Sequence, residues 1–556
     1  MKKILLVLLS CHSTLCFSGT PADSVKVTLS MAAPGALELR YDLPPGCTRL
    51  EFMNAGIKPN PAAVIRKQWT PLDQCAEAGP EGINIKDSAC TSARFSVPTS
   101  ERRVDRVYPW AQPIDRGIYS HTSAFAVMPG CGPVSWVFDA GPGRVVVDGT
   151  PLGARSEHGP ATPHIHYAPV IFLQDKLAAG ADPFLHRDSR IEKWATDALH
   201  RDLRQIEANY RKQMPGLEGA TPFLLTVAVP KGQGGWGDVA NRKTMRLNYP
   251  MSPSPAQQTK LKLYVAHESA HVFQASEANE RWKDEITLIN EGGAEFLAWL
   301  SSAQLGWKDR AALATQLEDA LNKCLIEVGD NRYASVERRG WGKTPYDCGL
   351  AMHVFGLAGR ARPTNMNHVL RDYYLDAKQG RPTDFARAIE CGKQRGCEAQ
   401  WLPRMLSGPE TLPQVIQAYA AKTGLMQPAT ELSPDMLKVV GRRTFGALMV
   451  HDCKGQISIY QEDEASRIGQ VDSCATLREN MAIVAVEGFN LLTRPEAVPA
   501  LLKACREKGQ TVLGLEDGSK VTIPCNDSIQ APSGLYAVNA ERLFKRLGLT
   551  LPAQRK

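Results

Sequence analysis

The chain has 556 residues, of which 43% are hydrophobic and 22% charged, and it carries a formal net charge of +7 at pH 7. This length exceeds one ordinary hydrophobic core, so we expect a multidomain protein, and the composition excludes a disordered tail or a membrane bundle. Lys and Arg form no dense run, so a nucleic-acid partner is not expected.

Residues 1–19 have the order of a secretory signal peptide. Residues 1–3 start with positive charge, residues 4–9 are apolar, and small residues such as Ser18 and Gly19 follow. The apolar run is far below the ~20 residues that span a bilayer, and no later segment reaches that length. We therefore expect an exported protein, periplasmic or secreted, without a transmembrane segment. Lipidation at Cys11 is the less favoured alternative.

Residues 20–188 predict a β-rich N-terminal domain, sandwich-like in pattern. Short apolar runs there are punctuated by Gly and Pro, for example at residues 25–29, 36–41, 124–128 and 144–147. The pattern changes at Ser189, where Ser189 and Glu192 form a predicted capping box ahead of a long amphipathic helix.

Residues 189–430 combine strands and helices and predict an α+β domain that continues into helices. Residues 222–229 and 245–249 are predicted strands on either side of the glycine-rich stretch 232–237. Helical periodicity then dominates to about Gly424, with one clear amphipathic helix over residues 309–328.

A predicted helix in this region carries a metal-binding pattern. Ser254, Pro255 and Gln257 supply a cap, a first-turn proline and a reciprocal glutamine, so the helix should run to about Gln274. Histidines four residues apart on a helix project from the same face, and Glu268 stands beside that face, where a general base belongs. The two histidines are His267 and His271.

A catalytic zinc ion needs a third protein ligand, and Asn290 to Glu295 supplies a candidate. Glu291 and Glu295 share a helix face, so Glu291 can bind the metal while Glu295 accepts the ring N–H of a ligand histidine. The alternative is a solvated acidic face, but the flanking residues are small or apolar.

The two motifs, His267-Glu268-Ser269-Ala270-His271 and Asn290-Glu291-Gly292-Gly293-Ala294-Glu295, resemble those of the gluzincin metallopeptidases. The resemblance implies a thermolysin-like α+β catalytic domain, Zn²⁺ bound by His267, His271 and Glu291, and Glu268 as the base. The 19 residues between His271 and Glu291 match thermolysin-like spacing. The motif Asn290-Glu291-Gly292 instead resembles that of the alanyl aminopeptidase and leukotriene hydrolase family, so the subfamily stays open.

Thr344-Pro345-Tyr346-Asp347 predicts a helix with Thr344 as its cap. Aminopeptidase-type enzymes have a similar Pro-Tyr-acid-x-Gly sequence, so the resemblance implies that Tyr346 stabilises the oxyanion. The alternative is a tyrosine that only packs. The family's Gly-x-Met-Glu-Asn strand has no clear match here, and Gly235 and Asp238 are weak candidates for substrate binding, since an Asp in such a loop ordinarily forms a turn.

Residues 431–556 predict a small α/β domain. A strand and turn over residues 477–488, a helix over residues 495–508 capped by Thr493, and a hairpin turning at Asp517-Gly518 are similar in order to the second half of a PDZ domain. The exported glycyl aminopeptidase family, which this chain also resembles, joins a gluzincin core to a C-terminal PDZ domain. Peptide binding by the domain stays open.

Twelve cysteines follow the signal peptide and fall into three groups of four, one in each predicted region. Export favours disulfides over free thiols, and we expect each group to pair within itself. In the helical group Cys391 and Cys397 bracket a short loop, which leaves Cys324 to pair with Cys348.

The sequence therefore predicts an exported zinc-dependent peptidase that acts on a peptide or protein, with aminopeptidase-like cleavage favoured. Alternatives are an endopeptidase on the same scaffold, a catalytically weak or inactive binding protein, and an epoxide or ester hydrolase. Substrate preference and oligomeric state cannot be read from the sequence.

Overall fold

The structure is a computed structural model. It describes residues 24–551 except 34, 55–60, 102–109, 218–220, 230–235, 275–278, 337–338, 341, 361–365, 390–396, 399–400, 430–432, 462–464 and 526–533. The chain divides into two compact units. The first is Met1–Lys193 with Ala220–Ser252, and the second is Trp194–Gly219 with Pro253–Lys556.

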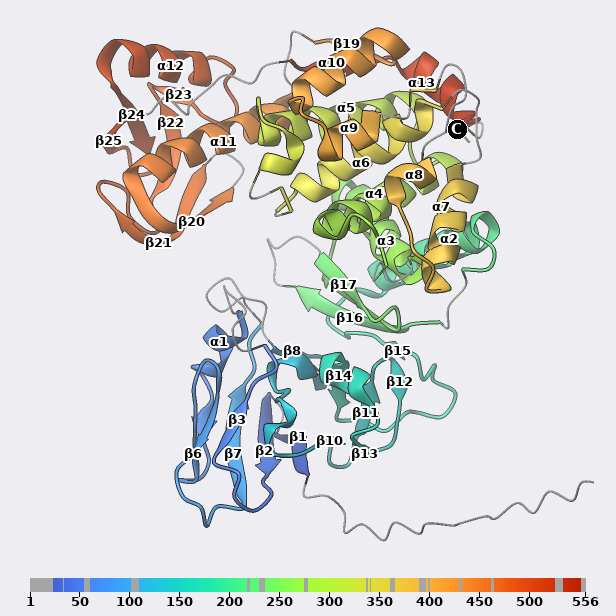
Figure 1. Cartoon of the computed structure of the whole chain (residues 1–556), viewed down its shortest axis with the longest axis vertical. Coiled ribbons are helices and arrows are strands. Elements are labelled where there is room, and N and C mark those ends of the chain that lie inside the picture. The colour runs from blue at the N-terminus through green and yellow to red at the C-terminus, as the bar shows by residue number, and fades with distance from the viewer. Residues whose placement is uncertain are drawn as a thin grey trace, which may run out of the picture. The chain divides into compact units, whose positions relative to one another are not determined.

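The first unit is built from sheets whose strands alternate buried and outward residues, because one face of each covers a core. In β2, Leu37, Leu39 and Tyr41 are buried while Glu38 and Arg40 point outward. The largest sheet of this unit runs β13 (Arg155–His158), β10 (Val134–Asp139), β1 (Val25–Ala33), β2 (Ala36–Asp42), β7 (Ser92–Pro98), β4 (Thr70–Pro71), and Figure 1 labels these strands except β4.

Among its described residues, this unit also holds three smaller sheets and a short α-helix. Apolar residues of the five-stranded and four-stranded sheets share one cluster, in which Ile171 packs with Phe223 and Leu225. The elements are β3 (Arg49–Glu51), β6 (Gly82–Ile85) and β5 (Ala76–Ala78); β12 (Thr150–Pro151), β11 (Arg144–Val147), β14 (Pro169–Leu173), β9 (Gly117–His121) and β8 (Ala111–Ile114); β15 (Leu185–His186), β16 (Phe223–Val229), β18 (Thr244–Pro250) and β17 (Trp236–Ala240); and α1 (Pro61–Arg66).

The strands β16, β17 and β18 thus group with the β-rich front of the chain, although they follow Ser189 in the sequence. The predicted cap at Ser189 is wrong, because the Asp188 carboxylate accepts from the Arg190 backbone N–H at 3.0 Å and holds a turn there. The long helix α2 therefore begins at Lys193. The finer division into domains stays a prediction.

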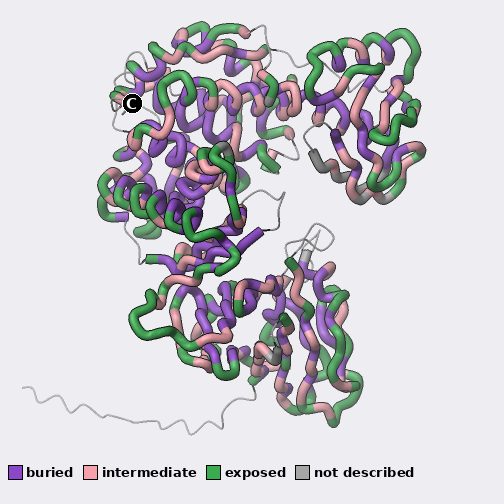
Figure 2. The backbone as a smooth tube through the Cα atoms, turned by 180° about the vertical axis from the view of Figure 1, so that it is seen from behind, coloured by how far each residue is buried: buried purple, intermediate pink, exposed green. Residues whose placement is uncertain are grey.

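The second unit is mainly helical, and its central helices are buried along most of their length (Figure 2). The predicted helix over residues 254–274 is confirmed as α3 (Pro255–Phe273), capped by Ser254 and Gln257. Its other elements are α2 (Lys193–Gln213), α4 (Ile286–Gln304), α5 (Arg310–Val328), α6 (Thr344–Ala358), α7 (Met366–Lys378), α8 (Phe385–Ile389), α9 (Trp401–Ser407), α10 (Leu412–Thr423), α13 (Ala540–Leu547), β19 (Met426–Pro428) and β26 (Tyr536–Val538).

The C-terminal region has its own apolar cluster beneath a sheet ordered β20-β21-β22-β24-β25. The hairpin at Asp517-Gly518 is confirmed, but the cap at Thr493 is wrong because the Asn490 side chain accepts from the Thr493 backbone N–H at 3.0 Å. The PDZ-like assignment stays a prediction. The elements are α11 (Pro434–Asp452), β20 (Cys453–Gln461), β21 (Ser466–Cys474), β22 (Ala482–Val486), β23 (Phe489–Asn490), α12 (Ala497–Lys508), β24 (Gln510–Leu515) and β25 (Lys520–Pro524).

Disulfides among the described residues stay within the predicted groups. The bond expected between Cys324 and Cys348 is confirmed, with their Cα atoms 4.8 Å apart. Cys391 lies outside the described residues, so its pairing with Cys397 stays a prediction. The other bonds are Cys47–Cys131, Cys75–Cys90, Cys453–Cys474 and Cys505–Cys525.

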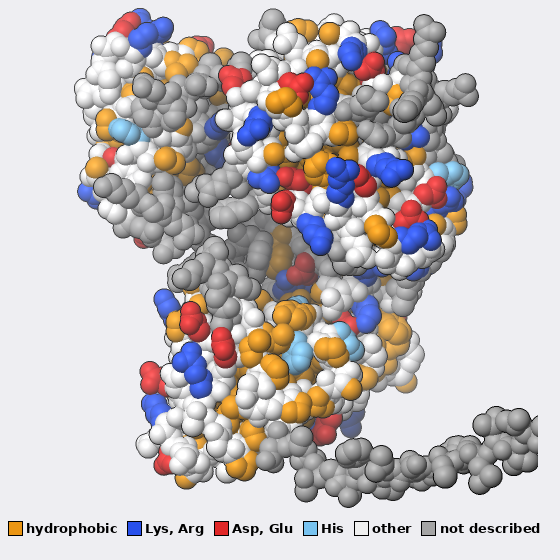
Figure 3. All heavy atoms as spheres, in the orientation of Figure 1, with side chains coloured by type: hydrophobic (Ala, Val, Ile, Leu, Met, Phe, Trp, Pro, Cys, Tyr) orange, Lys and Arg blue, Asp and Glu red, His pale blue; other side chains and the backbone are white. Residues whose placement is uncertain are grey.

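On the face that Figure 3 shows, acidic and basic side chains are interspersed. Among the described helices, none is both long and apolar enough to cross a membrane.

Candidate active site

Helix α3 presents His267, Glu268 and His271 from one stretch of its length. Apolar residues on its other faces, Val265, Ala266 and Ala270, are almost fully buried and fix the helix in the core. His267 and Glu268 are each only 7% exposed, so these polar groups stand in a low-dielectric setting where their mutual interactions are strong.

Helix α4 brings a carboxylate to the two histidine rings. The Nε2 atoms of His267 and His271 are 3.2 Å apart, and Oε2 of Glu291 lies 3.2 Å from the first and 3.6 Å from the second. A tetrahedral zinc ion with bonds of about 2.0–2.1 Å has ligand atoms separated by about 3.3–3.4 Å. The triangle therefore has the donor types and edge lengths that such an ion requires.

Electrostatics among these groups also favour a cation. Burial would lower the pKa of His267, but the neighbouring carboxylates of Glu291 and Glu295 outweigh it and raise that pKa to about 10. Burial likewise opposes ionisation of Glu291, yet the neighbouring imidazoles of His267 and His271 bring its pKa well below the ordinary value. Two carboxylates and Glu268 thus surround His267 with negative charge that a bound cation would neutralise.

Glu295 lies one helical turn after Glu291. Its Oε1 is 3.2 Å from Nδ1 of His267, on the side of the ring opposite the Glu291 contact. Its pKa is lowered, because the interaction with His267 outweighs the effect of burial. A carboxylate beside Nδ1 of a histidine supports metal binding through the other ring nitrogen, Nε2, when an ion is present.

The two glycines after Glu291 allow close approach from neighbouring elements. A Cβ on Gly292 would lie 2.3 Å from the Cα of Gly349 in α6, so α4 and α6 are in backbone contact there. A Cβ on Gly293 would lie 2.7 Å from the Tyr374 hydroxyl and 2.9 Å from Nε2 of Gln274.

Contact between α4 and α6 places Tyr346 beside the cluster of His267, His271 and Glu291. Its ring stacks on that of His267, with centroids 5.5 Å apart and planes 19° from parallel. Burial, the charge of Glu291 and a hydrogen bond with Glu291 raise the pKa of Tyr346, so the phenol keeps its proton at neutral pH. The predicted cap at Thr344 is wrong by one residue, since Lys343 is the N-cap of α6.

Gln274 is a site residue that sequence reasoning missed. Its Oε1 lies 2.6 Å from Nδ1 of His271, and its Nε2 donates to the Asn290 carbonyl at 2.8 Å. The available signal was a polar residue at the C-cap of an otherwise apolar turn, three positions after His271.

Of the predicted substrate residues, Asp238 belongs to the first unit, whereas His267, His271 and Glu291 belong to the second. Asp238 lies on β17 in the first unit, where its carboxylate accepts hydrogen bonds from Arg246 at 3.1 and 2.5 Å. Gly235 lies outside the described residues.

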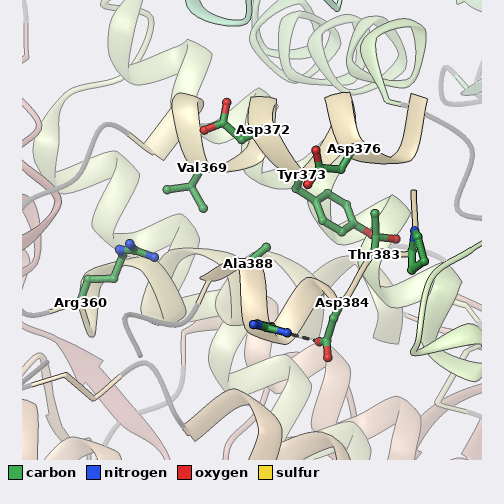
Figure 4. Close-up of a pocket in the computed structure, with 10 residues that line it drawn as sticks. Arg360, Val369, Asp372, Tyr373, Asp376, Thr383, Asp384 and Ala388 are labelled. Carbon is green, nitrogen blue, oxygen red and sulfur yellow. Dashed lines mark hydrogen bonds between the residues drawn. The ribbon is translucent and has the colours of Figure 1, made fainter. Parts of the chain in front are cut away.

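A cavity of about 490 Å³ between α7 and α8 contains none of the predicted site residues (Figure 4). Three carboxylates, those of Asp372, Asp376 and Asp384, line it. Each is paired with an arginine, so the cavity offers no unbalanced charge from these groups.

Comparison with solved structures identifies a related fold. The chain is similar to the crystal structure of an aminopeptidase N family protein from Idiomarina loihiensis, with a TM-score of 0.56 and 12% identity over 94% of this chain and 99% of that one. At that identity the likeness shows the fold alone, a multidomain α+β fold like that of an aminopeptidase N family protein.

Two structures of an M1 zinc metallopeptidase mutant show weaker likeness, one of them from Deinococcus radiodurans and one bound to L-arginine. Their TM-scores are 0.37 and 0.35, their identities 14% and 15%, and each match covers 70% of this chain and 95% of the other. No protein-family model and no curated protein matches the sequence.

Proposed function

We propose that this chain is an exported zinc-dependent peptidase with aminopeptidase-like activity. The observation that carries the proposal is the triangle of His267, His271 and Glu291, whose ligand atoms all lie within 4.8 Å of one another. The fold shared with an aminopeptidase N family protein supports the same class of reaction.

His267, His271 and Glu291 would hold Zn²⁺. When bound, the ion would polarise a peptide carbonyl and lower the pKa of water to near neutrality. The carboxylate of Glu295 lies beside Nδ1 of His267. Histidines that bind metal ions in other proteins commonly have such a partner at the second ring nitrogen, and it orients the ring.

Glu268 would be the general base. It follows the first ligand directly, is almost fully buried, and interacts electrostatically with both His267 and Tyr346. A carboxylate in this place can accept a proton from the attacking water and deliver it to the leaving amine.

Tyr346 would stabilise the oxyanion. Its raised pKa keeps the O–H as a donor, and its stacking on His267 holds the ring beside the cluster. A neutral donor aimed at developing negative charge stabilises the transition state more than the substrate.

Aminopeptidase-like cleavage is the part of this proposal that rests on sequence resemblance. Asp238 is a weak candidate for binding substrate, because its carboxylate already accepts hydrogen bonds from Arg246. Peptides with free and acetylated N-termini separate the two modes, since an exopeptidase cleaves only the free form. Export rests on the predicted signal peptide and is consistent with the disulfides.

The decisive experiment measures zinc content and hydrolysis of a peptide library together. We expect about one zinc per chain, and we expect Glu268→Gln to abolish hydrolysis while zinc remains bound, because an amide cannot accept the proton. Glu207→Gln on α2 is the matched control and should keep full activity. Zinc without hydrolysis of any peptide or ester would favour the inactive binding protein, and absence of zinc would contradict the proposal.

A further inference from the structure

Gln274 joins the two helices that carry the candidate metal ligands. It is the C-cap residue of α3, only 3% exposed, and its backbone N–H donates to the Ala270 carbonyl. Its side chain reaches both His271 on α3 and the Asn290 carbonyl on α4, the residue before Glu291.

The hydrogen-bond pattern fixes which way the amide points. The Asn290 carbonyl can only accept, so the group 2.8 Å from it must be the Gln274 NH₂. The second N–H of that group reaches the Tyr374 hydroxyl at 3.2 Å. Oε1 of Gln274 must therefore face Nδ1 of His271.

This orientation decides the tautomer of His271. Oε1 is an acceptor, so Nδ1 of His271 at 2.6 Å must carry the hydrogen. Nε2, which points at His267 and Glu291, is then left with its lone pair in the plane of the ring. The ring is held in the protonation state and direction that metal binding needs.

Gly293 makes room for this arrangement. Because Gly293 has no side chain, Nε2 of Gln274 and the Tyr374 hydroxyl can lie 2.9 and 2.7 Å from the position that a Cβ would occupy. Any side chain at that position would displace the amide from His271.

We propose that Gln274 is a positioning residue that fixes the Nδ1–H tautomer of His271 and sets its register against Glu291, so that it controls metal affinity. The inference rests on the proposed zinc site. It assigns Gln274 the role for His271 that Glu295 has for His267.

The test compares zinc affinities of the purified full chain by competition with a chelator at pH 8. Gln274→Met removes both the acceptor and the donor, and we expect affinity to fall ~10–100-fold. Gln274→Glu keeps the acceptor facing His271 and loses the donors to Asn290 and Tyr374, so its affinity should stay within about threefold of the parent. The matched control is Gln304→Met. Gln304 is the last residue of α4, and its side-chain oxygen accepts a hydrogen bond from Asn209 on α2.

A merely structural Gln274 gives a different pattern. Both variants lose a bond between α3 and α4, so thermal unfolding of the metal-free protein should be lowered in both. If zinc affinity falls in proportion to the loss of thermal stability, and falls as much in Gln274→Glu as in Gln274→Met, the positioning role is wrong. If Gln274→Met binds zinc like the parent, it is also wrong. A parent that binds no zinc would instead contradict the proposed function.

A measurement without these variants guards against failure to fold. Long-range ¹H–¹⁵N spectra of histidine-labelled, zinc-loaded protein report the tautomer of each ring, and the rings of His267 and His271 are those whose ¹⁵N signals change when a chelator removes the zinc. We expect the Nδ1–H tautomer for both of these rings, and an Nε2–H tautomer at His271 would overturn the inference.

Discussion

Gly292 of α4 and Gly349 of α6 are in direct backbone contact, and a Cβ built on either would lie 2.3 Å from the Cα of the other. Gly292 directly follows the candidate ligand Glu291, and Gly349 lies three residues after Tyr346. The contact therefore sets the distance between a candidate metal ligand and the candidate oxyanion donor.

Gly349→Ala should move α6 away from α4. Because the facing atoms are backbone, they cannot rotate aside, and we expect a loss of about 1–3 kcal/mol in the free energy of unfolding. Peptide hydrolysis should fall further than stability accounts for, since Tyr346 moves with the helix. Thermal unfolding and kcat measure the two effects. Gly446→Ala in α11, where a Cβ meets only Ile459 at 3.9 Å, should be neutral or slightly stabilising.

Tyr346→Phe should lower kcat by ~10² or more with little change in KM, because its hydrogen bond strengthens only in the transition state. The aromatic ring and its stacking on His267 are retained, so zinc content should not change. Tyr333→Phe, which removes another buried hydroxyl, is the control and should leave kcat unchanged. Equal activity of Tyr346→Phe and parent would show that the oxyanion role is wrong.

Local sequence signals predicted the helices of the site well. Ser254, Pro255 and Gln257 mark the start of α3 because a capping box depends on neighbouring residues alone. The same reasoning failed at Ser189, where Asp188 holds a competing turn with partners supplied by a distant strand, including the Ala228 backbone N–H at 2.7 Å. Capping patterns cannot reveal such tertiary competition.

The clustering of His267, His271 and Glu291 could be predicted from the sequence, whereas the residues that contact the far side of the two histidine rings were predicted only in part. Spacing along α3 and α4 brings His267 and Glu291 to one side of each helix, which is a property of helical geometry. Gln274 on α3 donates a hydrogen bond to the backbone carbonyl of residue 290 on α4. Every residue type has that carbonyl, so the sequence carries no signal for this contact.

Removing the Cys324–Cys348 bond should cost roughly 3 kcal/mol in the chain-entropy model. The bond ties α5 to α6 two residues after Tyr346, so the double alanine variant should also lose kcat at temperatures where it remains folded. The Cys75–Cys90 pair closes a loop of 15 residues in the first unit and is the control. Its removal should lower thermal stability without changing kcat, and an equal effect of the two variants on kcat would contradict the prediction.

Asp347, next to Tyr346, should make stability fall as pH rises. Burial raises its pKa from 3.8 to about 7, with Lys323 and Lys343 opposing the shift and Glu295 and Glu327 adding to it. Between pH 4 and 7 the unfolded chain has lost a proton that the folded chain keeps, so the free energy of unfolding decreases with pH there and is level above 7.

Asp347→Asn keeps the shape of the side chain without its charge. The variant should be as stable as the parent near pH 4 and more stable at pH 8, by on the order of 1 kcal/mol or more. Most other groups titrate alike in the two proteins, so the difference between their unfolding temperatures at pH 4, 6 and 8 reports Asp347 together with its interaction with Glu295. Asp372→Asn, an exposed partner of Arg371, is the control and should give a small difference at every pH. If the gain from Asp347→Asn is the same at pH 4 and pH 8, the carboxyl group is already ionised in the folded protein throughout this range.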